Sequence, residues 1–91
     1  MVDRYDPDEL LSFPCFHEFK AFGPATDDAF QGAVLQAVNQ VVPVSREAMR
    51  TRLSSGGRYQ CVTVLVHLQN SAQLQSIYAI LRGIKGLCYL L

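Results

Sequence analysis

The 91-residue sequence has no long apolar run, no C-x-x-C cysteine pair, and almost no acidic residue in its second half. A membrane-spanning helix needs about 20 consecutive apolar residues, and no run approaches that length. The N-terminal segment MVDRYDPDELL is acidic and has neither a basic n-region nor an apolar h-region, so we expect no signal peptide. These absences predict a cytoplasmic protein of bacterial type with no membrane partner.

The three cysteines are too few and too scattered for a disulfide framework or a zinc clip. A metal site built from Cys61, His67 and Cys88 would have to reach across strands that are about 4.8 Å apart each. We therefore predict no metal and no cofactor. The expected state is three reduced, mostly buried thiols that pack as small hydrophobic groups.

The net charge is zero, but the charges are unevenly placed. Seven of the eight acidic residues lie at or before Asp28, and only Glu47 follows. The basic residues of the second half are Arg46, Arg50, Arg52, Arg58, Arg82 and Lys85. Such an asymmetry can mark a surface for an anionic partner. It can also mean that two halves of one small domain neutralise each other, and the pI of about 6.7 favours this second interpretation.

Hydrophobic periodicity predicts six elements in a single domain over residues 13–91, preceded by an N-terminal arm over 1–12 with a helical turn at 7–11. Gly83 and Gly86 are expected to end the second helix in left-handed conformations. The six elements are a strand over 15–22, a helix that Thr26 caps and that ends near Val41–Val42, a strand over 46–53, a strand over 59–68, a helix that begins at Asn70 or Ser71 with Gln73 completing a capping box, and a short buried strand within LCYLL.

This order predicts an α+β fold, the ferredoxin-like βαββαβ two-layer sandwich. Right-handed crossovers set the order of the four antiparallel strands as 4-1-3-2. Both helices then cover one face of the sheet, and the other face stays open. A domain of this size buries only about 60–65% of the surface of its unfolded chain, which leaves little room for a deep catalytic cavity.

The stretch RLSSGGRYQ, from Arg52 to Gln60, has the composition of a phosphate-binding loop. A P-loop, however, leads into a helix and places a lysine at a fixed offset, whereas these glycines lead into a strand. We therefore predict a β-hairpin, with Gly56 and Gly57 at positive φ and an anion held at most weakly by Arg52 or Arg58. The residues of this hairpin motif are Ser54, Ser55, Gly57, Arg58 and Tyr59.

Two stretches, FPCFHEFKAFG and SSGGRY, resemble the YbeD-like family of small bacterial proteins, and the resemblance runs from about Leu10 to Leu91. His17 departs from the family pattern because an apolar residue, commonly Phe, is typical there. Leu53 departs as well, since Pro is typical before the paired serines. The positions that match the motifs are Phe13, Pro14, Lys20, Gly23, Ser54, Ser55, Gly57 and Tyr59.

The resemblance implies a fold similar to the ACT-type regulatory domains of amino-acid enzymes. Some family members are described as lipoate-regulatory, and the resemblance supplies no catalytic residue. ACT-type domains bind small effectors near the loop that follows the first strand. The corresponding candidate ligand-binding residues here are Lys20, Gly23, Pro24, Ala25 and Thr26.

The open face of the predicted sheet is too apolar to remain bare in a monomer. We expect a homodimer that pairs sheet to sheet, or a partner protein that docks there, with Lys20 and Glu18 at a polar centre. The expected interface residues are Phe16, Phe22, Leu65 and Leu90, with Tyr59 beside them.

Two other classes of function fit the sequence less well. RNA recognition motifs place three aromatic residues on this face, and only Tyr59 occupies one of those positions on the third strand, so a nucleic-acid partner is not favoured. Cys15 and His17 share one side of a strand, but nothing orients the imidazole and no oxyanion donors are evident. We predict no catalytic residues and no enzyme activity.

The sequence thus predicts a small non-enzymatic regulatory or adaptor domain that acts through its open sheet face and senses a small metabolite at the loop after the first strand. A single-stranded RNA-binding module is the alternative. A structural subunit of a larger assembly is the third.

Overall fold

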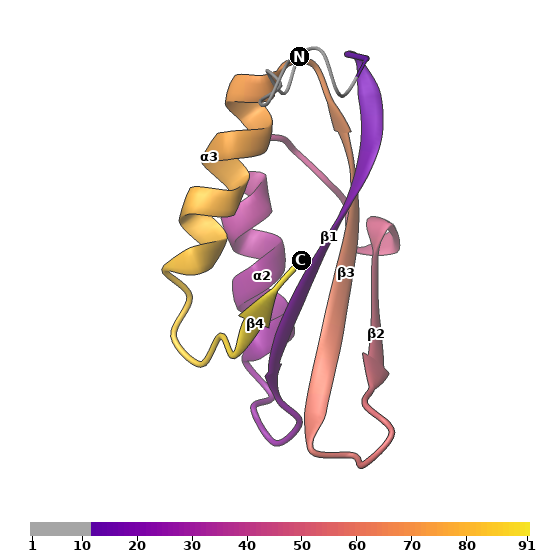
Figure 1. Ribbon diagram of the computed structural model, residues 1–91, viewed down its shortest axis with the longest axis vertical. Helices are drawn as coiled ribbons and strands as arrows, with labels where there is room; N and C mark the ends of the chain where they lie inside the picture. The colour runs from indigo at the N-terminus through magenta and orange to yellow at the C-terminus, as the bar shows by residue number, and fades with distance from the viewer. Residues whose placement is uncertain (1–11) are drawn as a thin grey trace, which may run out of the picture.

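The computed structural model describes residues 12–91, so the predicted turn at 7–11 and nearly all of the predicted arm lie outside the described residues. Strands and helices follow one another in the predicted βαββαβ order, which is confirmed (Figure 1). The elements are β1 (Cys15–Pro24), α2 (Phe30–Asn39), the 3₁₀ turn η1 (Arg46–Ala48), β2 (Met49–Leu53), β3 (Tyr59–Leu68), α3 (Ser71–Arg82) and β4 (Tyr89–Leu90).

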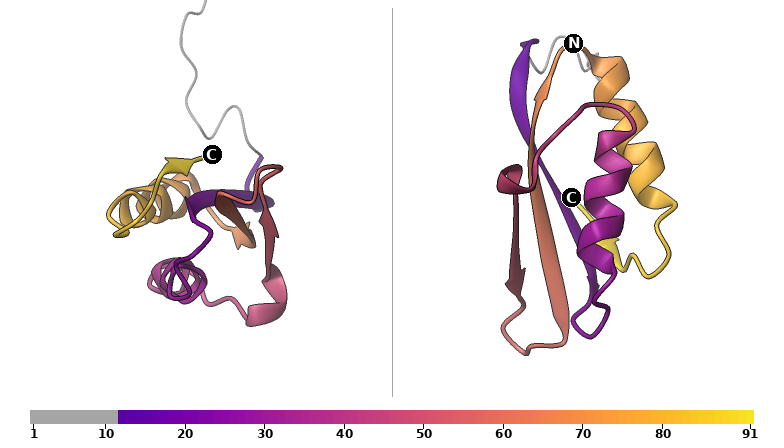
Figure 2. Two further views of the ribbon diagram at one scale, coloured as in Figure 1. Left: turned by 90° about the horizontal axis from the view of Figure 1, so that it is seen from below. Right: turned by 180° about the vertical axis from the view of Figure 1, so that it is seen from behind.

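The four strands form one antiparallel sheet in the order β2-β3-β1-β4, which is the predicted order. Its centre is a ten-residue pairing of β1 with β3, in which Cys15 lies opposite Leu68 and Pro24 lies opposite Tyr59. Both helices lie on the same side of this sheet (Figures 1 and 2). The other side is uncovered by the described residues, as the fold class predicts.

The hydrophobic core lies between the helices and one face of the sheet. Alternate residues of β1 and β3 point into it because side chains of a strand alternate between faces. Burying each Val, Leu or Phe side chain among them contributes about 1.5–3 kcal/mol. The fully buried members of the core are Phe19, Ala21, Phe30, Val34, Val38, Val62, Val64, Val66, Leu68, Ile77 and Leu81.

The start of α3 agrees with the expected cap. Asn70 Oδ1 accepts a hydrogen bond from the Gln73 backbone N–H at 2.9 Å, which satisfies one of the unpaired donors of the first turn. The Gln73 side chain, expected to bind the Asn70 N–H, accepts instead from the Gln69 N–H at 2.7 Å. Neither helix within residues 12–91 is long and apolar enough to cross a membrane.

The prediction that Thr26 caps the first helix is wrong. The helix begins at Phe30, and Ala29 at its N-cap makes no side-chain cap. Asp27 Oδ1 accepts from the Ala29 N–H at 3.1 Å, and the Asp27 N–H donates to Pro24 O. The side-chain oxygen and the N–H of Asp27 thus take part in local turns rather than in the first turn of a helix.

The first helix also ends earlier than expected, at Asn39 rather than near Val41–Val42. The Asn39 side chain donates to Leu35 O at 2.9 Å and to Val44 O at 3.1 Å, and it accepts from the Val44 N–H at 3.1 Å. An Asn side chain that binds backbone on both sides favours a turn over a continued helix.

Three further local predictions need correction. Residues 46–48 form the 3₁₀ turn, so that strand begins at Met49. Gly83 and Gly56 do not have positive φ, whereas Gly57 and Gly86 do, at 69° and 92°. The last strand contains only Tyr89–Leu90, and Tyr89 is 60% exposed rather than buried.

Candidate functional site

The open face of the sheet, the side away from α2 and α3, carries most of the predicted interface. The register aligns its side chains in rows across the strands. In one row Arg50, Thr63 and Lys20 lie side by side, and in the next row Arg52, Cys61 and Phe22 do so. Side chains of this face come from β1 (Phe16, Glu18, Lys20, Phe22), β2 (Arg50, Arg52), β3 (Tyr59, Cys61, Thr63, Leu65, His67) and the C-terminal residues (Tyr89, Leu91).

Leu90 does not belong to this face, so the prediction that places it on the open face is wrong. It lies opposite Ala21 and packs against the core. Lys20 and Leu91 exchange two backbone hydrogen bonds, of 3.1 and 2.8 Å, and this pairing fixes the register of the chain end. Tyr89 and Leu91, which the sequence interpretation omitted, are therefore the residues that reach the open face.

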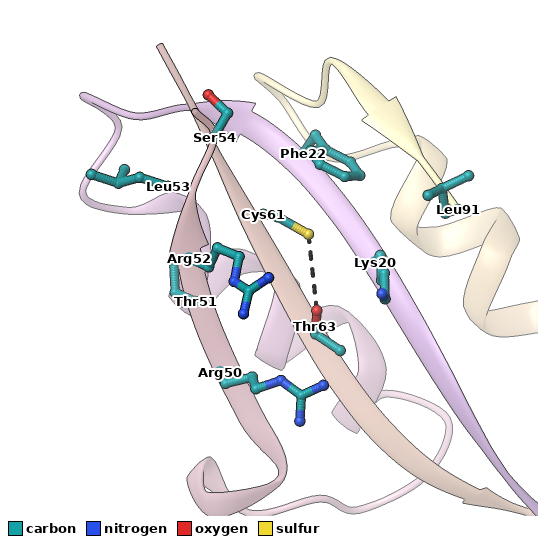
Figure 3. A pocket seen from close by; sticks show the side chains of 10 residues that line it. All are labelled: Lys20, Phe22, Arg50, Thr51, Arg52, Leu53, Ser54, Cys61, Thr63 and Leu91. Carbon is teal, nitrogen blue, oxygen red and sulfur yellow. Dashed lines mark hydrogen bonds between the residues drawn. The ribbon is translucent and has the colours of Figure 1, made fainter. Parts of the chain in front are cut away.

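A hollow of about 400 Å³ lies over the two central rows of the open face (Figure 3). We call it the basic hollow because three cations line it: Lys20, Arg50 and Arg52. Thr63, at its floor, is 7% exposed although it lies on the uncovered side of the sheet. The other lining residues are Phe22, Thr51, Leu53, Ser54, Cys61 and Leu91.

The basic hollow has an excess of positive charge. Arg50 Nη2 donates to Glu18 Oε2 at 3.0 Å, and both side chains are exposed, so this pair contributes at most about 1 kcal/mol. It is the one ion pair among residues 12–91. Lys20, which is half-buried, and Arg52, which is exposed, therefore have no acidic partner in that part of the chain. Among these residues, the predicted neutralisation of one half of the chain by the other occurs only between Arg50 and Glu18.

Aromatic side chains lie at both ends of the open face. Phe16 packs against His67 with ring centroids 4.7 Å apart. At the other end Phe22 and Tyr89 are 5.9 Å apart and, with Tyr59 and Cys88, line a smaller hollow of about 260 Å³. Phe16, Tyr59 and Leu65 are 68%, 40% and 42% exposed, so the apolar side chains of this face stay accessible.

The candidate ligand-binding residues do not form one site. Lys20 lines the basic hollow, whereas Gly23, Pro24, Ala25 and Thr26 do not. The loop's polar backbone groups are used inside the protein. The buried Gln60 side chain donates to Pro24 O and to Asp27 O, both at 2.9 Å, and the Ala25 N–H donates to Arg58 O at 3.1 Å.

Gly23 has a packing role at this loop. A Cβ atom there would lie 2.7 Å from the Phe30 ring, closer than real contacts allow. The absence of a Cβ atom at Gly23 thus allows the Phe30 ring of α2 to pack directly against the backbone of β1. Sequence reasoning could not detect this role because it depends on how the helix packs on the strand.

The hairpin motif connects β2 and β3 through local hydrogen bonds. The Ser54 N–H donates to Tyr59 O at 2.9 Å, and the Gly57 N–H donates to Ser54 O at 2.8 Å. Ser54 Oγ accepts from the Tyr59 N–H at 3.1 Å. The positive φ of Gly57 suits a turn that only glycine adopts without strain, while Ser55 and Arg58 are exposed at its tip.

His17 packs against aromatic side chains of β1 and α3. Its ring meets Phe19 edge to face at 4.7 Å, and its Nε2 lies 3.0 Å from Tyr78 Oη. Burial lowers the pKa of His17, and the nearby Glu18 carboxylate opposes this in part. Burial likewise raises the pKa of Tyr78, against a smaller effect of Arg82. His17 therefore joins the sheet to α3 and makes no contact with Cys15 that would activate a thiol.

The cysteines are free, but the prediction that they are mostly buried is wrong, because Cys15 and Cys61 are half-buried and Cys88 is exposed. Cys61 Sγ lies 3.9 Å from Thr63 Oγ1, beneath the basic hollow. Within the described part of the chain, no three His, Cys, Asp or Glu residues cluster in a way that could hold a metal ion.

Comparisons with known proteins place the chain in a family. A family model described as protein of unknown function, DUF493, matches residues 8–91. UPF0250 proteins of Shewanella sediminis and of Neisseria meningitidis serogroup C are 33% and 35% identical to it; the alignments cover 87% of this chain and 88% of the first relative, and 93% of both chains for the second.

The solution structure of HP0495 from H. pylori matches with a TM-score of 0.70 over 98% of both chains at 10% identity, which supports the fold. The fold, the two motifs and the relatives thus agree. The chain belongs to the DUF493 family, whose relatives in Shewanella and Neisseria are called UPF0250 proteins, and the resemblance to the YbeD-like family is confirmed.

Proposed function

We propose that this protein is a non-enzymatic adaptor or regulatory domain that binds an acidic partner protein on the open face of its sheet. The observation that carries the proposal is the basic hollow. It presents three cations against one neighbouring acid, and exposed apolar side chains surround it. An apolar patch with complementary charge is the usual composition of a transient protein interface.

The same charges argue against the sheet-to-sheet homodimer. Two copies that meet face to face would each bring Lys20 and Arg52 without an acidic partner from residues 12–91. Burying an excess of like charge is costly because the lost hydration is not replaced by ion pairs. An acidic partner replaces that hydration with charge-assisted hydrogen bonds, which are among the strongest that side chains form.

Single-stranded RNA is the second candidate, and one observation favours it. Phe22, Tyr59 and Tyr89 gather beside the basic hollow, where they could stack on bases. The aliphatic Leu65 and Leu91, also exposed on this face, suit a protein surface better than a base-stacking platform. A protein partner therefore accounts for more of the open face.

Titration with two anionic probes tests the proposal. The probes are a ten-residue oligoglutamate and a ten-nucleotide oligouridylate, and solution mass is measured by light scattering in parallel. We expect a monomer that binds oligoglutamate and loses about tenfold in affinity on Arg52→Glu, because a close charge pair contributes about 1.4 kcal/mol or more. Arg82→Glu, at the end of α3, is the matched control and should have no effect.

Three results would overturn the proposal: preference for oligouridylate with strong salt dependence, a stable dimer at low concentration, or binding that Arg52→Glu and Arg82→Glu weaken equally. The first would establish the RNA-binding alternative. The second would restore the homodimer.

A further inference from the structure

Strand β2 lies at one edge of the sheet. It is the last strand in the order β2-β3-β1-β4, and no described residue pairs with its outer side. Its residues from Arg50 to Leu53 are all exposed. Strand β4, at the opposite edge, has only two residues, so β2 is the longer place where another strand could be added.

The hydrogen-bond pattern shows which backbone groups of β2 point outward. In an antiparallel pair, bonded and non-bonded residue pairs alternate. Ser54 and Tyr59 are a bonded pair at the hairpin, with Ser54 N–H to Tyr59 O at 2.9 Å. The alternation continues along the register from this pair. The backbone of Arg52 is therefore hydrogen-bonded to that of Cys61, and the backbone of Arg50 to that of Thr63. The N–H and C=O groups of Thr51 and Leu53 therefore point to the free edge.

A hydrogen bond between β3 and β1, on the other side of β3, shows independently which residues of β3 bind β2. The Ala25 N–H donates to Arg58 O at 3.1 Å, next to the pairing of β1 with β3. Alternation from this bond directs Gln60, Val62 and Val64 toward β1. Cys61 and Thr63 are thus the residues of β3 that bind β2, in agreement with the alternation that starts at the hairpin.

The side chains of β2 determine what kind of strand can pair with it. Arg50 and Arg52 lie on the open face, with Thr51 between them on the other side. A second copy that paired antiparallel about Thr51 would place Arg50 of each copy opposite Arg52 of the other. Like charges directly opposite one another destabilise a strand pair. An acidic segment reverses the sign of both cross-strand contacts.

We infer that β2 receives an extended acidic segment of the partner protein as an added fifth strand, an inference that rests on the proposed function. The segment has an acid–x–acid pattern whose central residue lies opposite Thr51. Its two carboxylates then lie on the open face beside Arg52 and Arg50. Exposed Leu53 favours an apolar residue opposite it, on the other side of the added strand.

The two arginines do not contribute equally. Arg50 already donates to Glu18 at 3.0 Å, whereas Arg52 forms no ion pair with residues 12–91. The carboxylate opposite Arg52 therefore gains a new partner, and the one opposite Arg50 shares an existing one. We expect Arg52→Glu to weaken binding more than Arg50→Glu does.

The test uses the blocked pentapeptide acetyl-Val-Glu-Val-Glu-Val-amide and amide exchange measured by NMR on the full chain. In the antiparallel arrangement the central Val binds Thr51 through its backbone, while the two Glu N–H groups face away. A peptide N-methylated at the central Val should lose binding, and one N-methylated at the second Glu should retain it. This pair of peptides separates strand addition from simple attraction of charge.

The expected result is slower exchange of the Thr51 and Leu53 amides in proportion to peptide bound, with Arg50 and Arg52 amides unchanged. Met49 serves as an internal reference because its N–H already donates to Arg46 O. Unchanged exchange at Thr51 and Leu53, or equal binding of both N-methylated peptides, would overturn the inference.

The two proposals can fail separately. If oligoglutamate binds in an Arg52-dependent way but the pentapeptide leaves Thr51 and Leu53 unprotected, the open face binds acidic partners without strand addition. The arginines of β2 would then serve only to prevent association of sheet edges. If neither acidic probe binds, both proposals fail.

Discussion

The two faces of the sheet differ although the same strands build them. On the helix-covered side of β3, Val62, Val64 and Val66 are fully buried. On the open side, one residue away in each case, Thr63 lies below cations and Leu65 is 42% exposed. Most of the buried apolar side chains of the sheet thus lie on the covered face, so we expect stability to depend more on the covered face than on the open one.

Two phenylalanines of β1 give the largest expected effect. Phe19 is fully buried on the covered face, and Phe16 is 68% exposed on the open face. We expect Phe19→Ala to lower the free energy of unfolding by about 3–5 kcal/mol because it leaves a cavity. Phe16→Ala should cost less than about 1 kcal/mol. Urea unfolding measures both, and Phe19→Leu serves if the alanine variant does not fold.

Equal losses for the two phenylalanine variants would contradict the distinction between the faces. A large loss for Phe16→Ala alone would mean that the open face is covered in the isolated protein. That outcome would redirect attention to self-association.

Gly23 and Gly32 offer a second comparison, of intermediate size. A Cβ atom on Gly23 would meet the Phe30 ring at 2.7 Å, while one on Gly32 has no atom within 4 Å. We expect Gly23→Ala to destabilise the protein by about 1–3 kcal/mol through overpacking. Gly32→Ala, inside α2, should stabilise it by up to about 1 kcal/mol. Thermal unfolding would show shifts of opposite sign, and a harmless Gly23→Ala would remove the packing role of this glycine.

The buried position of His17 predicts a smaller, pH-dependent effect. Because folding lowers the pKa of His17 below its ordinary value of 6.5, the unfolded chain takes up the proton first as the pH falls. Stability is therefore complete above pH 6.5 and decreases as the pH falls through that value toward the folded pKa. Denaturant midpoints from pH 7.5 to 5.5 should fall in the wild type and fall less in His17→Phe, with His67→Phe as the exposed control.

The smallest expected effect on stability comes from the basic hollow. Arg52 is exposed and unpaired among residues 12–91, so Arg52→Glu should change the free energy of unfolding by less than about 0.5 kcal/mol. The same substitution should weaken oligoglutamate binding about tenfold. A variant that loses stability and binding together would indicate that Arg52 supports the fold rather than the site.

The sequence predicted those elements well in which a hydrophobic pattern continues over many residues. Strand β3 has an apolar residue at every second position from Val62 to Leu68, and its bounds agree with the prediction. Asn70 was recognisable because a cap acts within one turn of chain. The start of α2 was missed because Thr26 suits a cap by composition, whereas the helix begins only at Phe30. The loop before it is bound instead by the Gln60 side chain, which donates to Pro24 O and Asp27 O from β3, and a contact so distant in sequence is not visible in a local pattern.

The site was harder to predict than the fold. Leu90 was assigned to the wrong face because a strand of two residues is too short to show an alternating pattern. Its register is fixed instead by backbone hydrogen bonds between Lys20 and Leu91, which the sequence does not reveal. The basic hollow joins Lys20, Arg50 and Arg52 from two strands that are not adjacent in the sheet. The uneven distribution of charge along the chain indicated a possible surface for an anionic partner, but it did not indicate which cations lie together. The strand register determines that.

Chemical-shift mapping with oligoglutamate would distinguish binding at the open face from binding elsewhere on the protein. If the open face is the binding surface, the perturbed signals come from the residues around Lys20, Arg52 and Thr63. Arg52→Glu then abolishes these perturbations while the unfolding midpoint stays the same. Perturbation confined to α2, α3 or the loop over 23–26, or none at all, would contradict binding at the open face.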